Sequence, residues 1–368
     1  MTLEEMPVLK IGDLEAKLPI IQGGMSVGVS LSCLSSAVAN EGGIGVIGAA
    51  LIGMLEDDFK KNFSEANKRA LRKEIRKAKK MTNGIIGVNI MIALTDFVEL
   101  AKIAIDEGAD LIFIGAGLPL KNVKMLCSES TKSTKIVPIV SSARATKIIF
   151  EYWEKMYERV PDAIVVEGPL AGGHLGFKIK DIYDAQYSLE NILPDIISIT
   201  QIFEKKFNKN IPVIAAGGVY SGSDIYKLFK QGIQGVQMGT RFVATHECDV
   251  STEFKESYVN CKKEDIEIIN SPVGLPGRVI KNVFLDNSFN GIDRSFSCPW
   301  QCLKTCDHKN APYCIAKALT NAKLGNIDKG FCFAGENAYK VDKIVSVKEL
   351  IETIQQEYQI AWRDERLE

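Results

Sequence analysis

The sequence predicts an α/β fold: a (β/α)8 TIM barrel with an appended, mostly helical C-terminal subdomain. Two observations lead to this prediction. Eight short apolar segments alternate with longer helical patterns between Pro19 and Gly239, and several of these helical patterns stop at a glycine. The apolar segments are almost uniformly hydrophobic, which is typical of parallel strands buried on both faces. Eight such units close naturally into a barrel.

The expected strands are short, and the expected helices are long enough to cross back over them. The strands are predicted at residues 19–22, 45–49, 85–90, 111–115, 136–141, 163–167, 212–216 and 235–239, and the helices at 31–40, about 57–80, 96–107, 145–159, 191–207 and 223–231. An open doubly wound sheet is the competing architecture. It is disfavoured because Gln22-Gly23-Gly24-Met25, and no G-x-G-x-x-G fingerprint, follows the first strand.

The alternation of strands and helices is lost from about Cys248 onward. We therefore expect residues 1–247 to form the barrel. Residues 248–368 are expected to form a helical, cysteine-containing extension that packs on the barrel.

Composition indicates a folded globular protein and excludes two classes of partner. Of the 368 residues, 46% are hydrophobic and 25% are charged, and the net charge of −1 provides no basic surface for nucleic acid. A basic run at 68–80 is interpreted as the solvated face of a helix. No apolar run of about 18 residues occurs, so no membrane span is expected. Residues 1–10 do not resemble a secretion leader, and a cytoplasmic location is therefore expected.

The most informative segment is the end of the sixth expected strand. This strand ends at Glu167, and a loop with four glycines and His174, one of only three histidines, follows directly. Strand ends of this polarity carry the chemistry of barrel enzymes, and Gly172 and Gly173 allow a ligand to approach the backbone. A neutral imidazole suits proton transfer near neutral pH. The alternative is a surface histidine in a glycine turn.

The loops after the seventh and eighth strands indicate a phosphate site. Gly217 and Gly218 follow the seventh strand, and Gln237-Met238-Gly239-Thr240 ends the eighth. Barrels commonly bind phosphate at these two loops, through backbone N–H groups that glycines leave accessible. The simpler alternative is that the glycines only permit tight turns.

These segments, taken in order, resemble the nitronate monooxygenase (2-nitropropane dioxygenase) family, which includes flavin-dependent enoyl-acyl-carrier-protein reductases. The resemblance rests on PIIQGGM, GVNIM, GAG, IVPIVSS, EGPLAGGHLG, IPVIAAGG and GVQMGTRF. It covers about residues 19–247, with weaker traces at 271–282 and 335–350. It implies a barrel that holds FMN, whose phosphate would occupy the two glycine loops.

The resemblance also implies roles for individual residues. Gln22, Gly23, Gly24 and Met25 would lie against the flavin, and Asn89 would hydrogen-bond it. Gly217, Gly218, Gln237, Met238, Gly239 and Thr240 would hold the phosphate, and Ser141, Glu167, Gly172 and Gly173 would complete the cofactor site. His174 would be the catalytic residue.

The implied activity is FMN-dependent oxidation of alkyl nitronates with O2. Within the same resemblance, the alternative is an NAD(P)H-dependent enoyl-acyl-carrier-protein reductase acting on an enoyl thioester, or a related NAD(P)H:flavin or quinone reductase. An alternative of another class is a non-catalytic module that binds a phosphate or flavin. The expected partner is a small-molecule substrate, and a homodimer is left open.

Cysteines are concentrated near the end of the chain. Cys298, Cys302 and Cys306 are spaced by four residues, which would place three thiols on one face of a helix, and Cys314 follows. Four thiolates could bind zinc or an iron–sulfur cluster, although neither C-x-x-C nor a standard cluster spacing is present. The alternative is a set of inert thiols.

Overall fold

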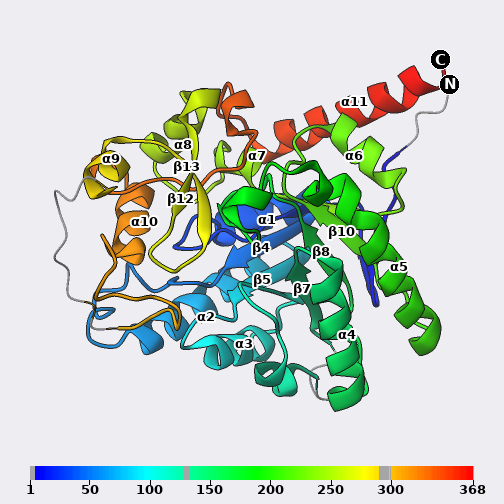
Figure 1. Ribbon diagram of the computed structural model, residues 1–368, viewed down its shortest axis with the longest axis horizontal. Coiled ribbons are helices and arrows are strands. Elements are labelled where there is room, and N and C mark those ends of the chain that lie inside the picture. The colour runs from blue at the N-terminus through cyan, green and yellow to red at the C-terminus, as the bar shows by residue number, and fades with distance from the viewer. Residues whose placement is uncertain (1–4, 128–132, 290–297, 299, 368) are drawn as a thin grey trace.

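Eight parallel strands form a closed barrel at the centre of the computed structural model, which describes residues 5–127, 133–289, 298 and 300–367 (Figure 1). In the order in which they hydrogen-bond around the barrel, the strands are β3 (Ile20–Gln22), β4 (Ile44–Gly48), β5 (Ile85–Met91), β6 (Leu111–Gly115), β7 (Lys135–Val140), β8 (Ile164–Glu167), β10 (Val213–Ala216) and β11 (Gly235–Met238). The predicted fold class is confirmed, and the bounds of each strand lie within one residue of those predicted.

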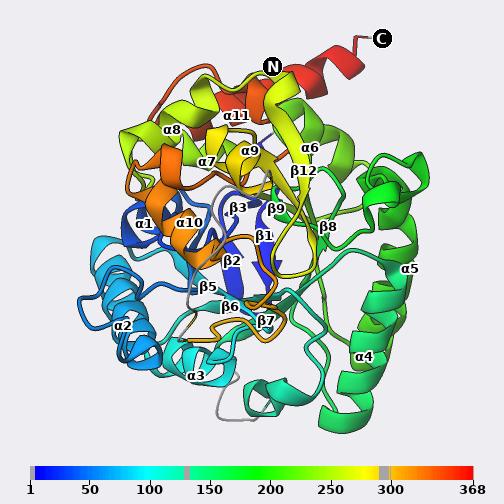
Figure 2. The same cartoon turned by 60° about the vertical axis from the view of Figure 1, so that its left-hand side comes forward.

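Helices surround the barrel (Figure 2). They are α1 (Ser32–Asn40), α2 (Phe63–Met81), α3 (Phe97–Asp106), α4 (Ala143–Tyr157), α5 (Leu189–Phe207), α6 (Gly222–Phe229) and the short α7 (Thr240–Val243). Helix α2 begins later than the sequence predicted, because residues 51–61 form turns. Its buried positions, which include Ala70, Leu71, Ile75 and Ala78, recur at helical spacing and leave the basic side chains on the other face.

A hairpin that the sequence analysis missed packs against the interior of the barrel. Strands β1 (Leu9–Ile11) and β2 (Leu14–Ala16) pair antiparallel around Gly12, whose φ of +62° suits glycine. Leu9 and Ile11 belong to the same buried cluster as Phe113 from inside the barrel. The hairpin therefore completes the core.

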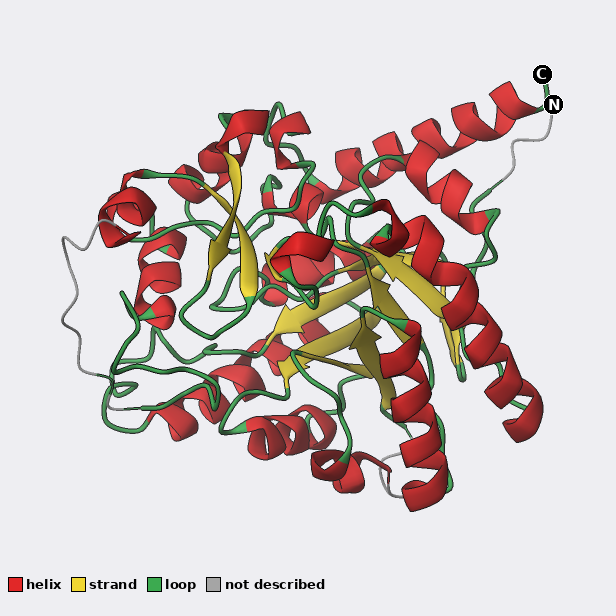
Figure 3. Ribbon diagram, in the orientation of Figure 1, coloured by secondary structure: helices red, strands yellow, loops and turns green. Residues whose placement is uncertain are grey.

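The extension adds both helices and strands to the fold. It contains α8 (Thr252–Val259), β12 (Ile266–Asn270), β13 (Pro276–Ile280), α9 (Val283–Phe289), α10 (Ile315–Lys323) and α11 (Val347–Glu365). Strand β13 also pairs with the two-residue strand β9 (Gly173–His174), so that a second, antiparallel sheet stands apart from the barrel strands (Figure 3). Among the described residues, no helix is long and apolar enough to cross a membrane.

The helix expected over residues 298–306 is wrong. Cys302 and its neighbours have irregular backbone, and Gln301 has a φ of +44°, which a right-handed helix excludes. Leu303 instead forms a bridge with Leu94, and the backbone N–H of Thr95 donates to the carbonyl of Cys302. Tertiary contacts with the loop after β5 therefore determine the conformation of this segment.

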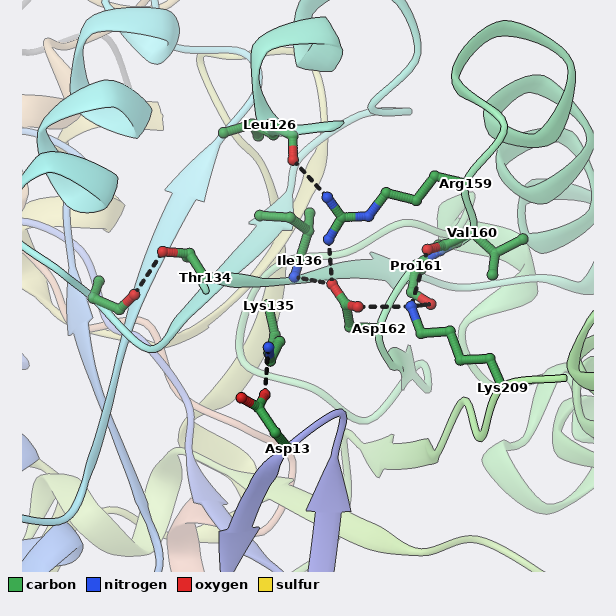
Figure 4. Close-up of polar contacts among 11 residues, drawn as sticks. Asp13, Leu126, Thr134, Lys135, Ile136, Arg159, Val160, Pro161, Asp162 and Lys209 are labelled. Atoms are coloured by element: carbon green, nitrogen blue, oxygen red, sulfur yellow. Dashed lines mark hydrogen bonds and ion pairs between the residues drawn. The ribbon is translucent and has the colours of Figure 1, made fainter. Parts of the chain in front are cut away.

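A buried carboxylate ties together the segments around the start of β8 (Figure 4). Asp162 accepts hydrogen bonds from the backbone N–H of Ile136 at 2.7 Å, from Arg159 Nη2 at 2.8 Å and from Lys209 Nζ at 2.6 Å. Its side chain is 7% exposed. One carboxylate thus links the strands β7 and β8 to the residues after α5, at the end of the barrel opposite to the candidate site, where we expect it to serve stability.

We predict that Asp162→Ala lowers the free energy of unfolding by about 3 kcal/mol, because it leaves two cations and a backbone N–H without their shared acceptor. Chemical denaturation measures this loss. Glu151→Ala is the control, since it removes an equal charge from an exposed i,i+4 pair with Lys147. Equal effects of the two substitutions would contradict the structural role of Asp162.

Candidate functional site

The ends of three barrel strands meet around Gly23 and Gly24, and Gly24 has no room for a side chain. A Cβ at Gly24 would overlap the side chain of Asn89, and one at Gly23 would lie 3.4 Å from Gln237 Cγ. The backbone N–H of Gly23 donates to the carbonyl of Met238 at 2.8 Å. The structure therefore brings together the predicted residues at the ends of β3, β5 and β11.

Two glutamines at this end of the barrel, Gln22 and Gln237, differ in the hydrogen bonds that their side-chain amides make. Gln22 Oε1 accepts from the backbone N–H of Val46 at 3.0 Å, and its Nε2 donates to the carbonyl of Gly23. Gln22 thus bonds to the barrel wall, so its predicted contact with a flavin would involve the backbone. Gln237 Oε1, in contrast, is buried and has no hydrogen-bond partner within the described part of the chain. A buried acceptor of this kind calls for a donor from a ligand or water.

His174 is held by residues of the extension. Its Nε2 lies 2.8 Å from Ser271 Oγ, and the ring of Phe333 meets the imidazole edge-on with centroids 4.9 Å apart. Burial lowers the pKa of His174 from 6.5 to about 4. The imidazole is therefore neutral at physiological pH, which is the form that can accept a proton.

Glu167 and Ser141 lie on either side of the same loop. Glu167 ends β8, and burial raises the pKa of its carboxyl group from 4.5 to about 7. Ser141 follows β7, and a Cβ at Gly176 would lie 2.5 Å from its Oγ. The glycine loop after β8 therefore packs closely against the end of β7.

The two central glycines of this loop have different surroundings. Gly172 is pressed against the extension, since a Cβ there would lie 2.7 Å from the carbonyl carbon of Ala334. Gly173 has a φ of +79°, and no described atom lies within 4 Å of the position where its Cβ would be. Gly172 thus allows the loop to approach the extension closely, and Gly173 leaves open space beside His174.

The expected phosphate loops are also supported by the extension. Gly217 and Gly218 have φ values of +83° and +100°, which other residues rarely adopt. Asn337 Nδ2 donates to the carbonyl of Gly218 at 2.7 Å, and the backbone N–H of Gly335 donates to Thr240 Oγ1 at 3.2 Å. A segment more than 90 residues distant in the chain therefore fixes both loops.

The remaining predicted contacts at this end of the barrel involve Met25 and Gly239. A Cβ at Gly239 would lie 3.8 Å from Met25 Sδ. The backbone N–H of Met25 donates to Ser30 Oγ at 2.8 Å. All the residues predicted to bind the cofactor thus lie at the carboxyl ends of barrel strands or in the loops that follow them.

The sequence analysis missed a buried arginine that supports the glycine loop. Arg278, in β13, is fully buried, and its Nη1 donates to the carbonyls of Pro169 at 2.8 Å and Ala171 at 2.6 Å. Its Nε lies 2.9 Å from a carboxylate oxygen of Glu336. The only sequence signal for these contacts was the weak family resemblance at 271–282 and 335–350. The spacing of residues along the chain does not reveal which segments meet when they lie about 100 residues apart.

The four predicted metal ligands receive less support. Among the described residues, no three histidine, cysteine or carboxylate side chains are arranged to hold a metal ion. Cys298, Cys302, Cys306 and Cys314 are all free thiols.

Comparison with known proteins decides the family. The model of the family described as nitronate monooxygenase matches residues 9–357. The chain belongs to this family, and it is therefore an oxidoreductase. The match includes most of the extension, with Ser271 and Phe333.

Individual relatives differ in their described activities. A probable nitronate monooxygenase of Staphylococcus aureus (strain Newman) is 28% identical over 300 residues, covering 74% of this chain and 78% of the relative. A (3aS,4S,5R,7aS)-5-hydroxy-7a-methyl-1-oxo-octahydro-1H-indene-4-carboxyl-CoA dehydrogenase of Mycobacterium tuberculosis (strain ATCC 25618 / H37Rv) is 24% identical, covering 91% of each chain. Sequence similarity alone thus does not choose between these substrate classes.

Solved structures give the same result for the fold. FabK from Thermotoga maritima superimposes with a TM-score of 0.71 at 28% identity, covering 95% of this chain and 94% of that chain. Nitroalkane oxidase from Streptomyces ansochromogenes also has a TM-score of 0.71, at 20% identity, covering 95% and 98%. The second likeness concerns the fold alone.

The raised pKa of Glu167 leads to a stability prediction. Because the folded-state pKa exceeds the unfolded value, the neutral carboxyl favours folding at low pH, and this contribution is lost as pH rises from 4.5 to about 7. Glu167→Gln removes the ionisable group, so the melting temperature of the variant relative to wild type is expected to rise across this interval. A difference in melting temperature that does not change with pH would contradict the raised pKa of Glu167.

Proposed function

We propose that the chain binds FMN at the barrel mouth and uses it to oxidise alkyl nitronates with O2. The observation that carries this proposal is the convergence of His174, the unsatisfied Gln237 Oε1 and two positive-φ glycines at the ends of neighbouring strands. Membership of the nitronate monooxygenase family supports the reaction class.

The residues present fit the proposed cofactor. Gly217, Gly218 and Gly239 leave their backbone N–H groups accessible for a phosphate, as expected for these two loops of a barrel. Gln237 Oε1 would accept a hydrogen bond from the polar edge of the flavin ring system, and this would satisfy the buried amide. A Cβ at Gly24 would overlap Asn89, so only glycine lets this backbone lie so close to a residue that would also contact the flavin.

When bound, FMN would accept electrons from the nitronate and return them to O2, and the protein would position and polarise the reactants. His174 is the residue suited to act on the substrate. As a neutral base it can abstract the α-proton of a nitroalkane, or it can hydrogen-bond the oxygens of a nitronate. Ser271 would fix the orientation of the imidazole through Nε2.

A second candidate function is the reduction of an enoyl thioester with NAD(P)H. It is favoured by the 28% identity and close superposition with FabK. The same histidine and the same cofactor loops would serve this reaction. The two functions differ in the compound that reduces the flavin.

We predict that Gly218→Asp abolishes retention of FMN, because it places a carboxylate beside the phosphate and a Cβ about 3.1 Å from Leu170. Gly232→Asp is the matched control for backbone strain, since its φ of +94° is similar and it lies in the turn before β11. Titration with FMN, followed by flavin fluorescence, measures both. The cofactor proposal fails if the wild-type protein takes up no FMN.

We predict that His174→Ala retains FMN and lowers turnover by about 10²-fold or more, the usual scale for a lost acid–base group. Ser271→Ala is expected to lower kcat by a smaller factor with little change in FMN affinity, because it removes only the contact that orients the ring. Steady-state kinetics measures both variants with 2-nitropropane, whose α-proton must be removed, and with propyl-2-nitronate, whose α-proton is already absent. An unchanged rate in His174→Ala would show that His174 is a loop residue without a catalytic role.

A further inference from the structure

Three consecutive residues of the extension each hold a different loop of the barrel. Gly335 and Asn337 bond to the two loops at which a phosphate is expected, as described above. Glu336, between them, bonds to the glycine loop after β8, because its backbone N–H donates to the carbonyl of Leu170 at 3.1 Å. The backbone of Glu336 is thus fixed on both sides, and its side chain starts from a defined position.

The side chain of Glu336 reaches the same loop through Arg278. Its Oε2 lies 2.9 Å from Arg278 Nε. The Nη1 of Arg278 donates to the carbonyls of Pro169 and Ala171, which flank the residue held by the backbone contact. Arg278 is fully buried, and within the described part of the chain Glu336 is the only acidic residue in an ion pair with it. A buried cation without its partner is strongly disfavoured, so the carboxylate determines where the guanidinium can lie.

Arg278 and His174 lie on opposite faces of the sheet formed by β9 and β13. Gly277 pairs with His174, and Arg278 pairs with Gly173. Side chains alternate between the two faces of a strand, and a Cβ at Gly277 would lie 2.9 Å from Cε1 of Phe333, whose ring meets the imidazole. Arg278 therefore lies on the face away from the imidazole, and we expect it to act on His174 through the backbone of β9 and of the loop before it.

We propose that Glu336 is a positioning residue for His174. The carboxylate holds Arg278, Arg278 holds the carbonyls that precede Gly172 and Gly173, and these glycines lead directly to the imidazole. Glycines allow the backbone many conformations, so contacts from outside the loop must select one of them. The inference rests on the proposed function, in which His174 acts on the substrate, and it assigns Glu336 no contact with substrate or flavin.

Loss of this carboxylate is expected to affect turnover and to spare the cofactor. We expect Glu336→Gln to lower kcat by about 10-fold or more with 2-nitropropane, because even a 1 Å misplacement of a reacting group can cost about 10²-fold in rate. The affinity for FMN is expected to stay close to that of wild type, because the contacts of Gly335 and Asn337 with the phosphate loops do not use this carboxylate. Steady-state kinetics and FMN titration measure the two quantities.

Glu267→Gln is the matched control, because it also removes a carboxylate from an ion pair beside β13. Glu267 lies in β12, 3.0 Å from Nζ of Lys281, which directly follows β13, and its side chain is 43% exposed. An exposed pair of this kind contributes little, so this variant is expected to keep wild-type turnover and FMN affinity.

A double-mutant cycle separates positioning from a general loss of structure. If Glu336 acts through the imidazole, Glu336→Gln adds little to the loss that His174→Ala already causes. If the substitution only loosens the fold, it lowers the residual rate of the His174→Ala protein by the same factor as in wild type. Circular dichroism establishes that each variant is folded. Glu336→Asp, which keeps the charge on a shorter side chain, takes the place of Glu336→Gln in the cycle if the latter does not fold.

Two results would overturn the inference in a wild-type protein that binds FMN and oxidises 2-nitropropane. One is a Glu336→Gln variant that turns over as fast as Glu267→Gln. The other is a cycle in which the losses from Glu336→Gln and His174→Ala multiply. A wild-type protein that takes up no FMN refutes the proposed function itself, and the two failures are therefore distinguishable.

Discussion

The pairing of β13 with β9 is the constraint on which the proposed site depends. Strand β9 consists only of Gly173 and His174, and within the described residues β13 is its one strand partner. The hydrogen bond from Ser271, the ring of Phe333 and the clamp of Arg278 on the preceding carbonyls all come from the extension. The barrel therefore supplies the loop, and the extension determines where the imidazole points.

Burial at this end of the barrel favours the neutral form of two side chains, His174 and Glu167. It lowers the pKa of His174 and raises that of Glu167, since desolvation disfavours the charged form of each. Near neutral pH the site thus presents a neutral imidazole and a carboxyl group close to its titration point. Partial exclusion of water of this kind would strengthen a hydrogen bond between a ligand and Gln237.

The barrel was predictable because its strands are uniformly apolar and its turns are marked by glycine. The hairpin around Gly12 carried a readable signal, the alternation of Leu9 and Ile11 with polar residues, but it is short. The roles of Ser271 and Arg278 could not be derived, because they depend on contacts across about 100 residues. The helix predicted over residues 298–306 is wrong because spacing by four does not determine conformation, and contacts of Cys302 and Leu303 with the loop after β5 hold an irregular backbone there.

The central claim is that the bound flavin is reduced by a nitronate. The direct measurement is anaerobic stopped-flow mixing of the FMN-loaded protein with propyl-2-nitronate and, separately, with NADH or NADPH. If the nitronate is the reductant, flavin absorbance is lost rapidly with the nitronate and is unchanged with the nicotinamides. Rapid reduction by NADH or NADPH, with no response to the nitronate, would contradict this claim and would establish the reductase function instead.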